Sequence, residues 1–241
     1  MKVQTERKLG WPVPNWREPP RPTGAVLDGQ AVRLEPLALA HAADLFEANR
    51  EDDRIWDYLP YGPFATEADY AAWVGKMAAS EDPMFYAIRS LRSGKAEGVA
   101  SFLRITPVAG SIEVGHICLS PRLQGGRAAT EAMFLMMDWA FANGYRRYEW
   151  KCDALNLPSR RAAERFGFSY EGVFRQHLVY KGRNRDTAWF AITDGDWPKL
   201  RAAYRTWLDA ANFDADGRQR QRLSDLTRPC LVSSDPALAG G

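Results

Sequence analysis

Two glycines directly before a long apolar segment form the part of this sequence best suited to hold an anion. They follow a β-type segment over residues 112–119 and precede a predicted helix over residues 127–142. Glycine lets backbone N–H groups turn inward, and the first N–H groups of a helix lack partners within it and carry partial positive charge. The segment at this junction consists of Gln124, Gly125, Gly126, Arg127, Ala128 and Ala129. The dinucleotide pattern G-x-G-x-x-G and the triphosphate pattern G-x-x-x-x-G-K-[ST] are both absent.

The composition fits one large globular domain or a domain with extensions. The chain has 241 residues, 46% of them hydrophobic, which is enough to build a substantial core. A net charge of +2 argues against a dedicated binder of nucleic acid or of anionic membranes. The three cysteines have no paired spacing, so we expect reduced thiols in a cytoplasmic protein. We expect no membrane span, since no run reaches about 18 apolar residues.

Alternation and turn residues predict a mixed α+β fold. Strands are predicted over residues 31–36, 84–89, 99–105, 112–119, 147–152, 168–180 and 186–192. Helices are predicted over residues 37–50, 66–79, 127–142, 156–167 and 197–208. Gly115 interrupts the fourth of these strands, and a glycine inside a strand often marks a bulge or the close approach of a ligand.

The chain divides into four parts. Residues 1–29 form an arm rich in proline and tryptophan, which we expect to lie on the body of the protein or on a partner. Residues 30–194 form the main domain, residues 195–214 a C-terminal helix packed on it, and residues 215–241 a tail that is either packed or loose. The aromatic arm and an apolar surface helix are compatible with a homodimer.

The anion loop and a second motif resemble those of one enzyme superfamily. The loop is similar to the Q/R-x-x-G-x-G/A loop that binds the pyrophosphate of coenzyme A in the GNAT (GCN5-related) N-acetyltransferases, with Arg127 replacing the central glycine. The Arg127 side chain could add a charge-assisted bond to a phosphate. The second motif consists of Asn156, Ser159, Ala163, Gly167 and Phe168. Together with Glu113-Val114-Gly115, it resembles the RimJ/RimL-type branch of the superfamily.

This resemblance spans residues 32–192 and implies both a fold and an activity. The implied fold is a GNAT-type mixed, mostly antiparallel sheet with splayed central strands, flanked by helices. The implied activity is direct transfer of acetyl from acetyl-CoA, without a metal, to a primary amine of a small molecule or a protein N-terminus. The alternative is a non-catalytic regulatory protein that binds acyl-CoA, and Arg127 in the loop keeps this alternative open.

Such a reaction needs a base, because the amine loses a proton as it attacks the thioester. Glu113 is the candidate, since it lies eleven residues before Gln124, the register that the superfamily base takes. A strand-edge glutamate that pairs with an arginine is an equal alternative. His116 also titrates near neutral pH, but simple strand alternation places it on the opposite face from Glu113. We therefore expect His116 to be a core residue with one satisfied ring nitrogen.

The same resemblance assigns the remaining contacts to acetyl-CoA. The strand residues expected to contact it are Ile117, Cys118 and Leu119. The exposed backbone amides of the first and last of these would bond the pantetheine arm and the thioester oxygen. Asn156 is expected both to cap its helix and to contact the acetyl donor. Ser159 is the candidate acid that protonates the leaving thiolate, and a helix-surface serine without a catalytic role is nearly as plausible.

Overall fold

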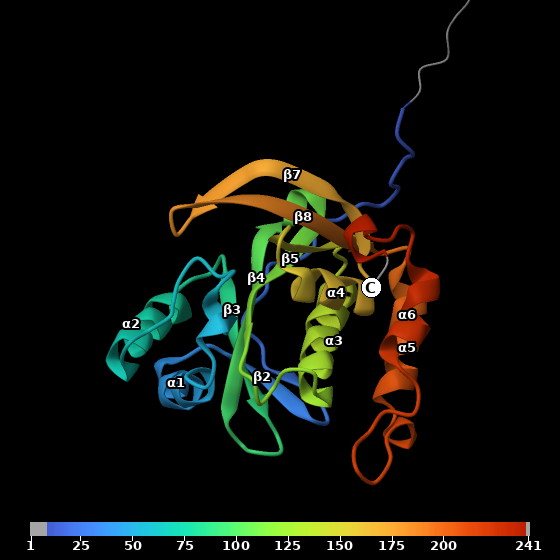
Figure 1. Cartoon of the computed structure of the whole chain (residues 1–241). Helices are drawn as coiled ribbons and strands as arrows, with labels where there is room; N and C mark the ends of the chain where they lie inside the picture. The colour runs from blue at the N-terminus through green and yellow to red at the C-terminus, as the bar shows by residue number, and fades with distance from the viewer. Residues whose placement is uncertain (1–8, 240–241) are drawn as a thin grey trace, which may run out of the picture.

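A twisted eight-stranded sheet runs through the centre of the protein, whose computed structural model describes residues 9–239 (Figure 1). In sheet order the strands are β1 (Leu27–Asp28), β2 (Val32–Pro36), β3 (Met84–Ser90), β4 (Ala96–Thr106), β5 (Ser111–Leu119), β6 (Arg147–Asp153), β8 (Arg183–Thr193) and β7 (Ser169–Tyr180). All neighbouring strands are antiparallel except β5 and β6, which are parallel. The predicted mixed, mostly antiparallel α+β fold is confirmed.

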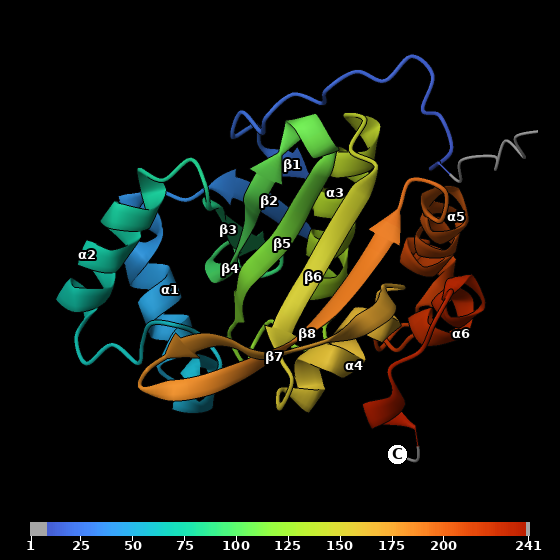
Figure 2. The ribbon, with the colours of Figure 1, turned by 90° about the horizontal axis from the view of Figure 1, so that it is seen from above.

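Helices cover both faces of this sheet (Figures 1 and 2). On one face lie α1 (Ala42–Asn49) and α2 (Glu67–Ala78), and on the other lie α3 (Arg127–Ala142), α4 (Leu157–Arg165), α5 (Trp197–Leu208) and α6 (Leu223–Thr227). The apolar cluster on the α3 face is the larger of the two, because α3 and α5 both bury side chains against the sheet. None of the helices within residues 9–239 has the length and apolar character needed to cross a membrane.

Strands β5 and β6 pair over only the first part of their lengths. The parallel pairing aligns Ser111 to Val114 with Arg147 to Trp150 and then stops. Beyond it, β5 continues to pair with β4, and β6 with β8. Residues 115–119 and 151–153 therefore diverge and leave one edge of each strand without a strand partner. This divergence, which the family resemblance implied, positions the site described below.

The β7–β8 hairpin arches across one end of the sheet toward the α1 and α2 side (Figure 1). Lys181, in its turn, donates from Nζ to the backbone oxygen of Trp56 at 2.9 Å. The loop before α2 also contacts the start of α4, since the Tyr58 hydroxyl donates to the backbone oxygen of Leu155 at 3.3 Å. Two segments far apart in the sequence thus form a roof over the divergence of β5 and β6.

The described part of the N-terminal arm lies along the body of the protein. Trp16 covers Gly110, where an added Cβ would come within 2.3 Å of the indole, and the Arg146 guanidinium lies 5.8 Å from the same ring. The Tyr145 hydroxyl donates to the backbone oxygen of Pro20 at 3.0 Å. Trp11, in contrast, is 80% exposed, so of these two tryptophans only Trp16 holds the described part of the arm against the body.

The C-terminal tail docks on α4 and β7 through polar contacts. Asp235 accepts two hydrogen bonds from Arg160 of α4, each at 2.5 Å, and neither side chain is more than 6% exposed. The Val232 N–H donates to the Ser169 hydroxyl at 2.9 Å at the start of β7. Because Arg160 follows Ser159 in α4, the tail directly supports the helix that carries two of the predicted site residues.

Candidate active site

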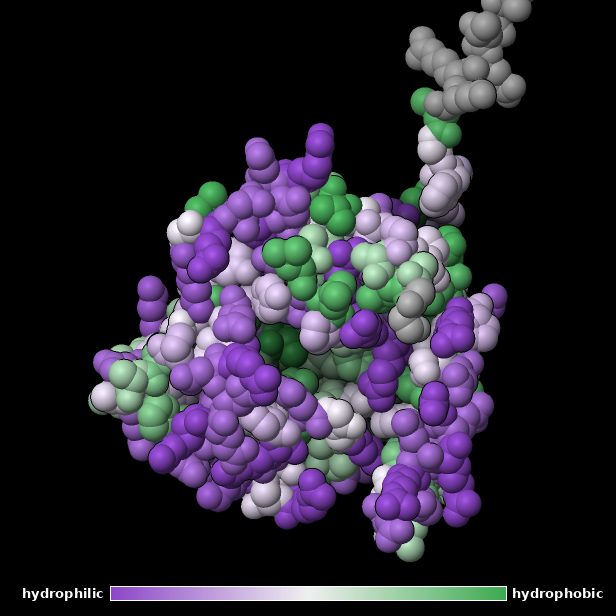
Figure 3. Space-filling view, viewed as in Figure 1, coloured by the Kyte–Doolittle hydropathy of each residue, from purple (hydrophilic) through white to green (hydrophobic). Residues whose placement is uncertain are grey.

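One cavity of about 930 Å³ passes through the divergence of β5 and β6. Figure 3 shows the hollow at the centre of one face, below the β7–β8 hairpin. On what we call the α3 side, its lining comes from α3, α4 and the 124–125 loop. On what we call the hairpin side, the lining comes from the 52–60 loop and from side chains of β4, β5, β6 and β8.

The predicted anion loop lies on the α3 side and presents unpaired backbone donors. Gly125 has φ +69°, a conformation that favours glycine, and no heavy atom lies within 4 Å of where its Cβ would be. Gly126 is the N-cap of α3 and contributes no side-chain cap. The first helix-type bond joins the Thr130 N–H to the Gly126 oxygen at 3.4 Å, so the N–H groups of residues 127–129 have no helical acceptor. The loop therefore fits a phosphate group.

Arg127 does not point its side chain into this loop. Its guanidinium donates to the Gln30 side chain at 2.9 Å and to the Leu208 backbone oxygen at 2.6 Å, and it stacks 4.7 Å from the Phe213 ring centroid. The predicted side-chain bond to a phosphate is wrong for this geometry, because these contacts hold the charge against the C-terminal segment. Only the backbone N–H of Arg127 remains at the loop, beside those of Ala128 and Ala129.

Strand β5 offers a backbone edge to the cavity next to the loop. The Ser120 N–H donates to the Glu97 oxygen of β4 at 3.0 Å, and backbone groups alternate in direction along a strand, so those of Leu119 face the open edge. The Gln124 side chain uses the Leu119 oxygen, donating to it at 2.9 Å. The Leu119 N–H is left for a ligand, and the side chains of Ile117 and Leu119 pack toward α3.

Cys118 turns its side chain to the other face and is buried. Its thiol packs among residues on the α1 and α2 face, and burial raises its pKa to about 12. The Cys152 thiol is also buried, which raises its pKa to about 11. Neither thiol is suited to act as a nucleophile near neutral pH, because the thiolate is the reactive form.

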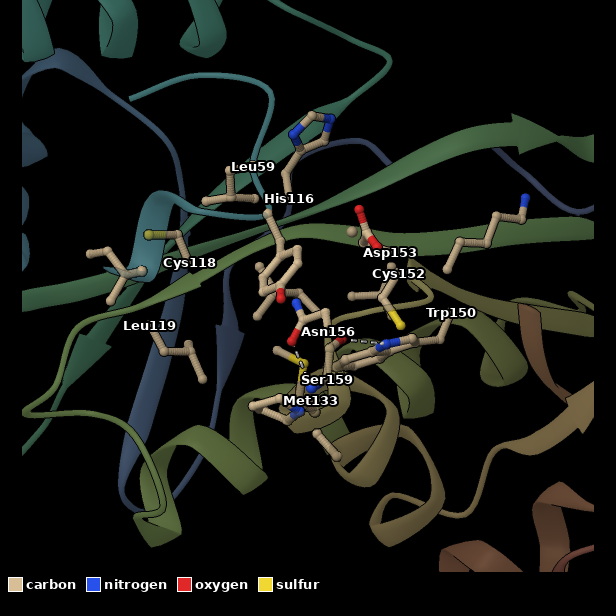
Figure 4. Close-up of a pocket in the computed structure, with 18 of the residues that line it drawn as sticks. Leu59, His116, Cys118, Leu119, Met133, Trp150, Cys152, Asp153, Asn156 and Ser159 are labelled. Carbon is tan, nitrogen blue, oxygen red and sulfur yellow. Dashed lines mark hydrogen bonds between the residues drawn. The ribbon is translucent and has the colours of Figure 1, made fainter. Parts of the chain in front are cut away.

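Asn156 and Ser159 both line the cavity at the start of α4 (Figure 4). The Asn156 side-chain oxygen accepts from the Ser159 N–H at 3.1 Å, so Asn156 is the N-cap of the helix. The indole N–H of Trp150 donates to the Ser159 hydroxyl oxygen at 3.1 Å. Since that oxygen accepts a bond from Trp150, the hydroxyl proton of Ser159 remains available for donation.

The arginines of α4 differ in what they can reach. Arg160 is committed to Asp235 and to the Ala154 backbone oxygen, at 2.7 Å. Arg165 donates to the Thr130 hydroxyl at 3.2 Å. Arg161 is exposed at the cavity, and its guanidinium forms no hydrogen bond or ion pair with any residue in the described range 9–239. Arg161 is therefore the α4 guanidinium best placed for an exposed phosphate.

Glu113 lies on the hairpin side and is held by two cations. One guanidinium nitrogen of Arg104 donates to both of its oxygens, at 2.8 and 2.7 Å, and the Lys151 ammonium lies 2.8 Å from one of them. Lys151 also pairs with Glu149 at 2.7 Å, and Glu113 is only 3% exposed. This is the arginine-paired arrangement that the sequence left open as the alternative to a base. If Glu113 took up a proton, it would lose the charge that both cations bind.

The predicted placement of His116 is wrong, because a β-bulge changes the alternation of β5. Val99 pairs with Cys118 whereas Ser101 pairs with Gly115, so β5 has one residue more than β4 between these pairs. His116 takes up the difference with φ +50°. Its ring therefore lies on the same face as Glu113, stacked on Tyr61, and lines the cavity (Figure 4). Burial, together with the charges of Arg104 and Arg185, lowers the pKa of His116 to about 4.

Two further residues of the hairpin side were not predicted from the sequence. Asp153, at the end of β6, accepts from the Tyr180 hydroxyl and from the Leu155 N–H, both at 2.9 Å. Arg185, in β8, donates from Nε to the Thr187 hydroxyl at 3.1 Å. Both line the cavity. The only sequence signal for Asp153 is its position at the end of a strand that the resemblance expects to splay, and Arg185 carries no such signal.

Comparison with known proteins identifies the family of this chain. Residues 31–169 match the family model described as an acetyltransferase (GNAT) domain, which is more than half of the chain. The chain belongs to the GNAT family. It is therefore an acetyltransferase, and the GNAT reaction uses acetyl-CoA as the acetyl donor. Among proteins with curated descriptions, none matches this GNAT chain significantly.

Solved structures similar to this GNAT protein are named as acetyltransferases. A GCN5-related N-acetyltransferase from Brucella melitensis is 45% identical with a TM-score of 0.87, and the match covers 90% of this chain and all of that one. A probable GNAT acetyltransferase from Chromobacterium violaceum is 40% identical with a TM-score of 0.75, over 80% and 98% of the two chains. The microcin C7 self-immunity acetyltransferase MccE, in complex with acetyl-CoA and AMP, shares the fold at 21% identity and a TM-score of 0.62, over 68% and 93%.

Proposed function

We propose that this GNAT protein transfers acetyl directly from acetyl-CoA to a primary amine, as a member of the RimJ/RimL-like branch. The observation that carries the proposal is the single cavity through the diverging strands. It joins a phosphate-binding loop on the α3 side to groups that can handle protons on the hairpin side. A donor and an acceptor could thus meet in the sheet from opposite faces, without an acyl-enzyme.

The α3 side holds the donor mainly through backbone groups. The N–H groups of residues 127–129 and of Gly125 bind the pyrophosphate, and Arg161 adds charge at the rim. The Leu119 N–H and the Asn156 side chain orient the pantetheine arm along the open edge of β5. Bound acetyl-CoA supplies a thioester whose carbonyl carbon bonds to the acceptor nitrogen as its bond to sulfur breaks.

On the hairpin side, His116 accepts the proton that the amine gives up. We assign the tautomer in which Nδ1–H donates to the Tyr61 hydroxyl oxygen at 3.2 Å, which leaves Nε2 with a free lone pair. Because its pKa is about 4, His116 is neutral and able to accept a proton at neutral pH. Glu113 is a positioning residue, since its carboxylate holds the side chains of Arg104 and Lys151 in place beside the acceptor.

On the α3 side, Ser159 donates its hydroxyl proton to the departing thiolate. Its oxygen already accepts the Trp150 N–H, and such a bond strengthens the hydroxyl as a donor. Ser159 also lies near the Cys152 thiol, whose pKa is raised chiefly by burial and is lowered slightly by this hydroxyl.

Release of free thiol from acetyl-CoA, measured in the presence of small amines and of short peptides with free N-termini, tests this function. We expect thiol release that depends on both acetyl-CoA and a primary amine, with a mass gain of one acetyl group on the acceptor. Tight binding of acetyl-CoA without amine-dependent thiol release would instead favour the regulatory alternative. The matched control is the same set of acceptors with the amine already acetylated.

A further inference from the structure

Charged side chains on the strands of the hairpin side form one paired chain, which leaves out two cavity-lining strand residues. Glu171, Arg147, Glu149, Lys151, Glu113 and Arg104 alternate in sign along this chain, with contacts of 2.5 to 2.8 Å. Each of these charges has a partner of opposite sign, so none requires a ligand for compensation. Of the charged strand residues that line the cavity, Asp153 and Arg185 are the two that do not belong to the chain. The remaining charged lining residues lie in the 52–60 loop and in α4, namely Asp52, Arg54, Asp57, Arg161 and Arg165.

Asp153 is a buried carboxylate without a cation. Only 6% of the residue is exposed, and its two hydrogen bonds come from neutral donors, the Tyr180 hydroxyl and the Leu155 N–H. Within residues 9–239 no lysine, arginine or histidine lies within ion-pair distance of it. A buried carboxylate is usually paired, so a cation arriving from the cavity would complete this site.

Arg185, on the neighbouring strand, is a cation without a carboxylate partner in the described range. Its Nε bonds to a neutral hydroxyl, its guanidinium carbon lies 5.8 Å from the Tyr180 ring centroid, and no carboxylate in the described range pairs with it. Asp153 is directly opposite Thr187 in the β6–β8 register, and Arg185 lies two residues before Thr187 in β8. Two residues span about 7 Å of strand, so the backbone positions of Asp153 and Arg185 lie a short distance apart on neighbouring strands.

We propose that this pair selects an acceptor that carries its own carboxylate next to the amine, namely a free amino acid. The inference rests on the proposed function and specifies its substrate. Asp153 holds the ammonium group as the acceptor enters, and this group gives one proton to solvent to become the neutral amine that attacks the thioester. Arg185 binds the carboxylate through charge-assisted hydrogen bonds.

The roof of the cavity favours the same class of small acceptor. Lys181 ties the hairpin turn to Trp56, and Tyr58 ties the 52–60 loop to Leu155. A protein N-terminus would have to pass beneath these contacts, and its first residue has an amide where a free amino acid has a carboxylate. The pair would therefore discriminate against peptides both by charge and by size.

The test compares each of the common free amino acids with its own carboxamide, at saturating acetyl-CoA. We expect the wild-type enzyme to acetylate one or more free amino acids with a kcat/KM at least about 10-fold above that of the matching amide, since a bond to a charged group is worth about that much. In Arg185→Gln this ratio should fall toward one, because only the free acid loses a charged partner. In Asp153→Asn turnover of acid and amide should fall together, because both carry the ammonium group.

Arg183→Gln is the matched control, since Arg183 is exposed on the same strand and does not line the cavity. It should keep the wild-type ratio. Calorimetric titration with acetyl-CoA, run on each variant, shows whether a loss of turnover comes from acetyl-CoA binding or from acceptor selection. Equal turnover of acids and amides, or turnover of peptides and simple amines alone, would overturn the inference while leaving the acetyltransferase intact. Absence of acetyl-CoA binding in the wild type would overturn both.

Discussion

The two sides of the cavity are built in different ways. The α3 side consists mostly of backbone N–H groups from one continuous segment, the end of β5, its loop and the start of α3. The hairpin side consists of side chains from four strands and one loop, arranged in ion pairs and aromatic contacts. A site made of local backbone is specified by a short motif, whereas a site made of distant side chains depends on the register of the whole sheet. The α3 side can therefore be recognised from local sequence, whereas the hairpin side cannot.

Removing the imidazole of His116 should have the largest effect on the hairpin side, because it should lower turnover without changing the affinity for acetyl-CoA. Positioned acid–base groups contribute about 10²- to 10⁴-fold in rate, so His116→Phe should lower kcat by about that factor. Acetyl-CoA affinity should be unchanged, because the phenyl ring keeps the stacking on Tyr61 and Phe85. The control is His177→Phe, since His177, on β7, bonds to Thr187 of β8 and does not line the cavity.

The pH dependence of kcat in the wild type tests the same role of His116. His116 accepts a proton only when it is neutral, so its contribution should be complete at neutral pH and should disappear as the pH falls through about 4. Because the folded-state pKa lies below that of the unfolded chain, neutral His116 also contributes stability that is lost over the same acid range. A limb in kcat near pH 6.5 that vanishes in His116→Phe would contradict this assignment.

Disrupting the tail should weaken the α3 side and leave the hairpin side unaffected. Asp235→Ala leaves the buried guanidinium of Arg160 without its charge partner, which should lower the free energy of unfolding by about 3–5 kcal/mol. Since Arg160 lies in the helix of Asn156 and Ser159, the KM for acetyl-CoA should rise more than the KM for the acceptor. Urea unfolding and steady-state kinetics measure both effects. Asp216→Ala removes an exposed pair with Arg218 and should change neither.

Loss of the Ser159 hydroxyl should have a moderate effect on turnover. Ser159→Ala removes the proposed proton donor and leaves the Trp150 N–H without its acceptor. We expect kcat to fall by about 10-fold, at the lower end of acid–base effects or below, because water in the open cavity can also supply a proton. Single-turnover kinetics measure this step. An unchanged kcat in a folded variant would return Ser159 to a structural role.

Changing Arg127 should have the smallest effect on the donor. Arg127→Gln removes contacts to Leu208 and Phe213 but keeps the backbone N–H at the loop. Acetyl-CoA affinity should change by less than about threefold, whereas Arg161→Gln, at the rim of the cavity, should weaken it more. Calorimetry on the two variants ranks them. A larger loss for Arg127→Gln would mean that its side chain turns to the phosphates when acetyl-CoA binds.

Local sequence predicted most of the fold and the outline of the α3 side. Strand alternation and turn residues located all seven long strands, and Gly125 and Gly126 marked the loop before α3. These features depend on neighbouring residues, so a short window contains the necessary information. The short strand β1 and the helix α6 were missed, since each is too short to show a periodic pattern.

The hairpin side was predicted poorly for physical reasons. Gly115 indicated a bulge or a ligand contact, but not that the bulge would bring His116 to the face of Glu113. The ion pairs of Glu113 depend on the β4–β5 and β5–β6 registers, which a single sequence does not contain. Likewise, nothing local indicates that Asp235 pairs with Arg160, 75 residues away.

Calorimetric titration with acetyl-CoA, of the wild type and of His116→Phe, tests the division between the two sides most directly. We predict micromolar binding, about −8 kcal/mol, that is the same for both proteins, together with a loss of turnover in the variant alone. Binding that is lost with the imidazole would contradict a donor site made from the backbone of the loop and the open edge of β5.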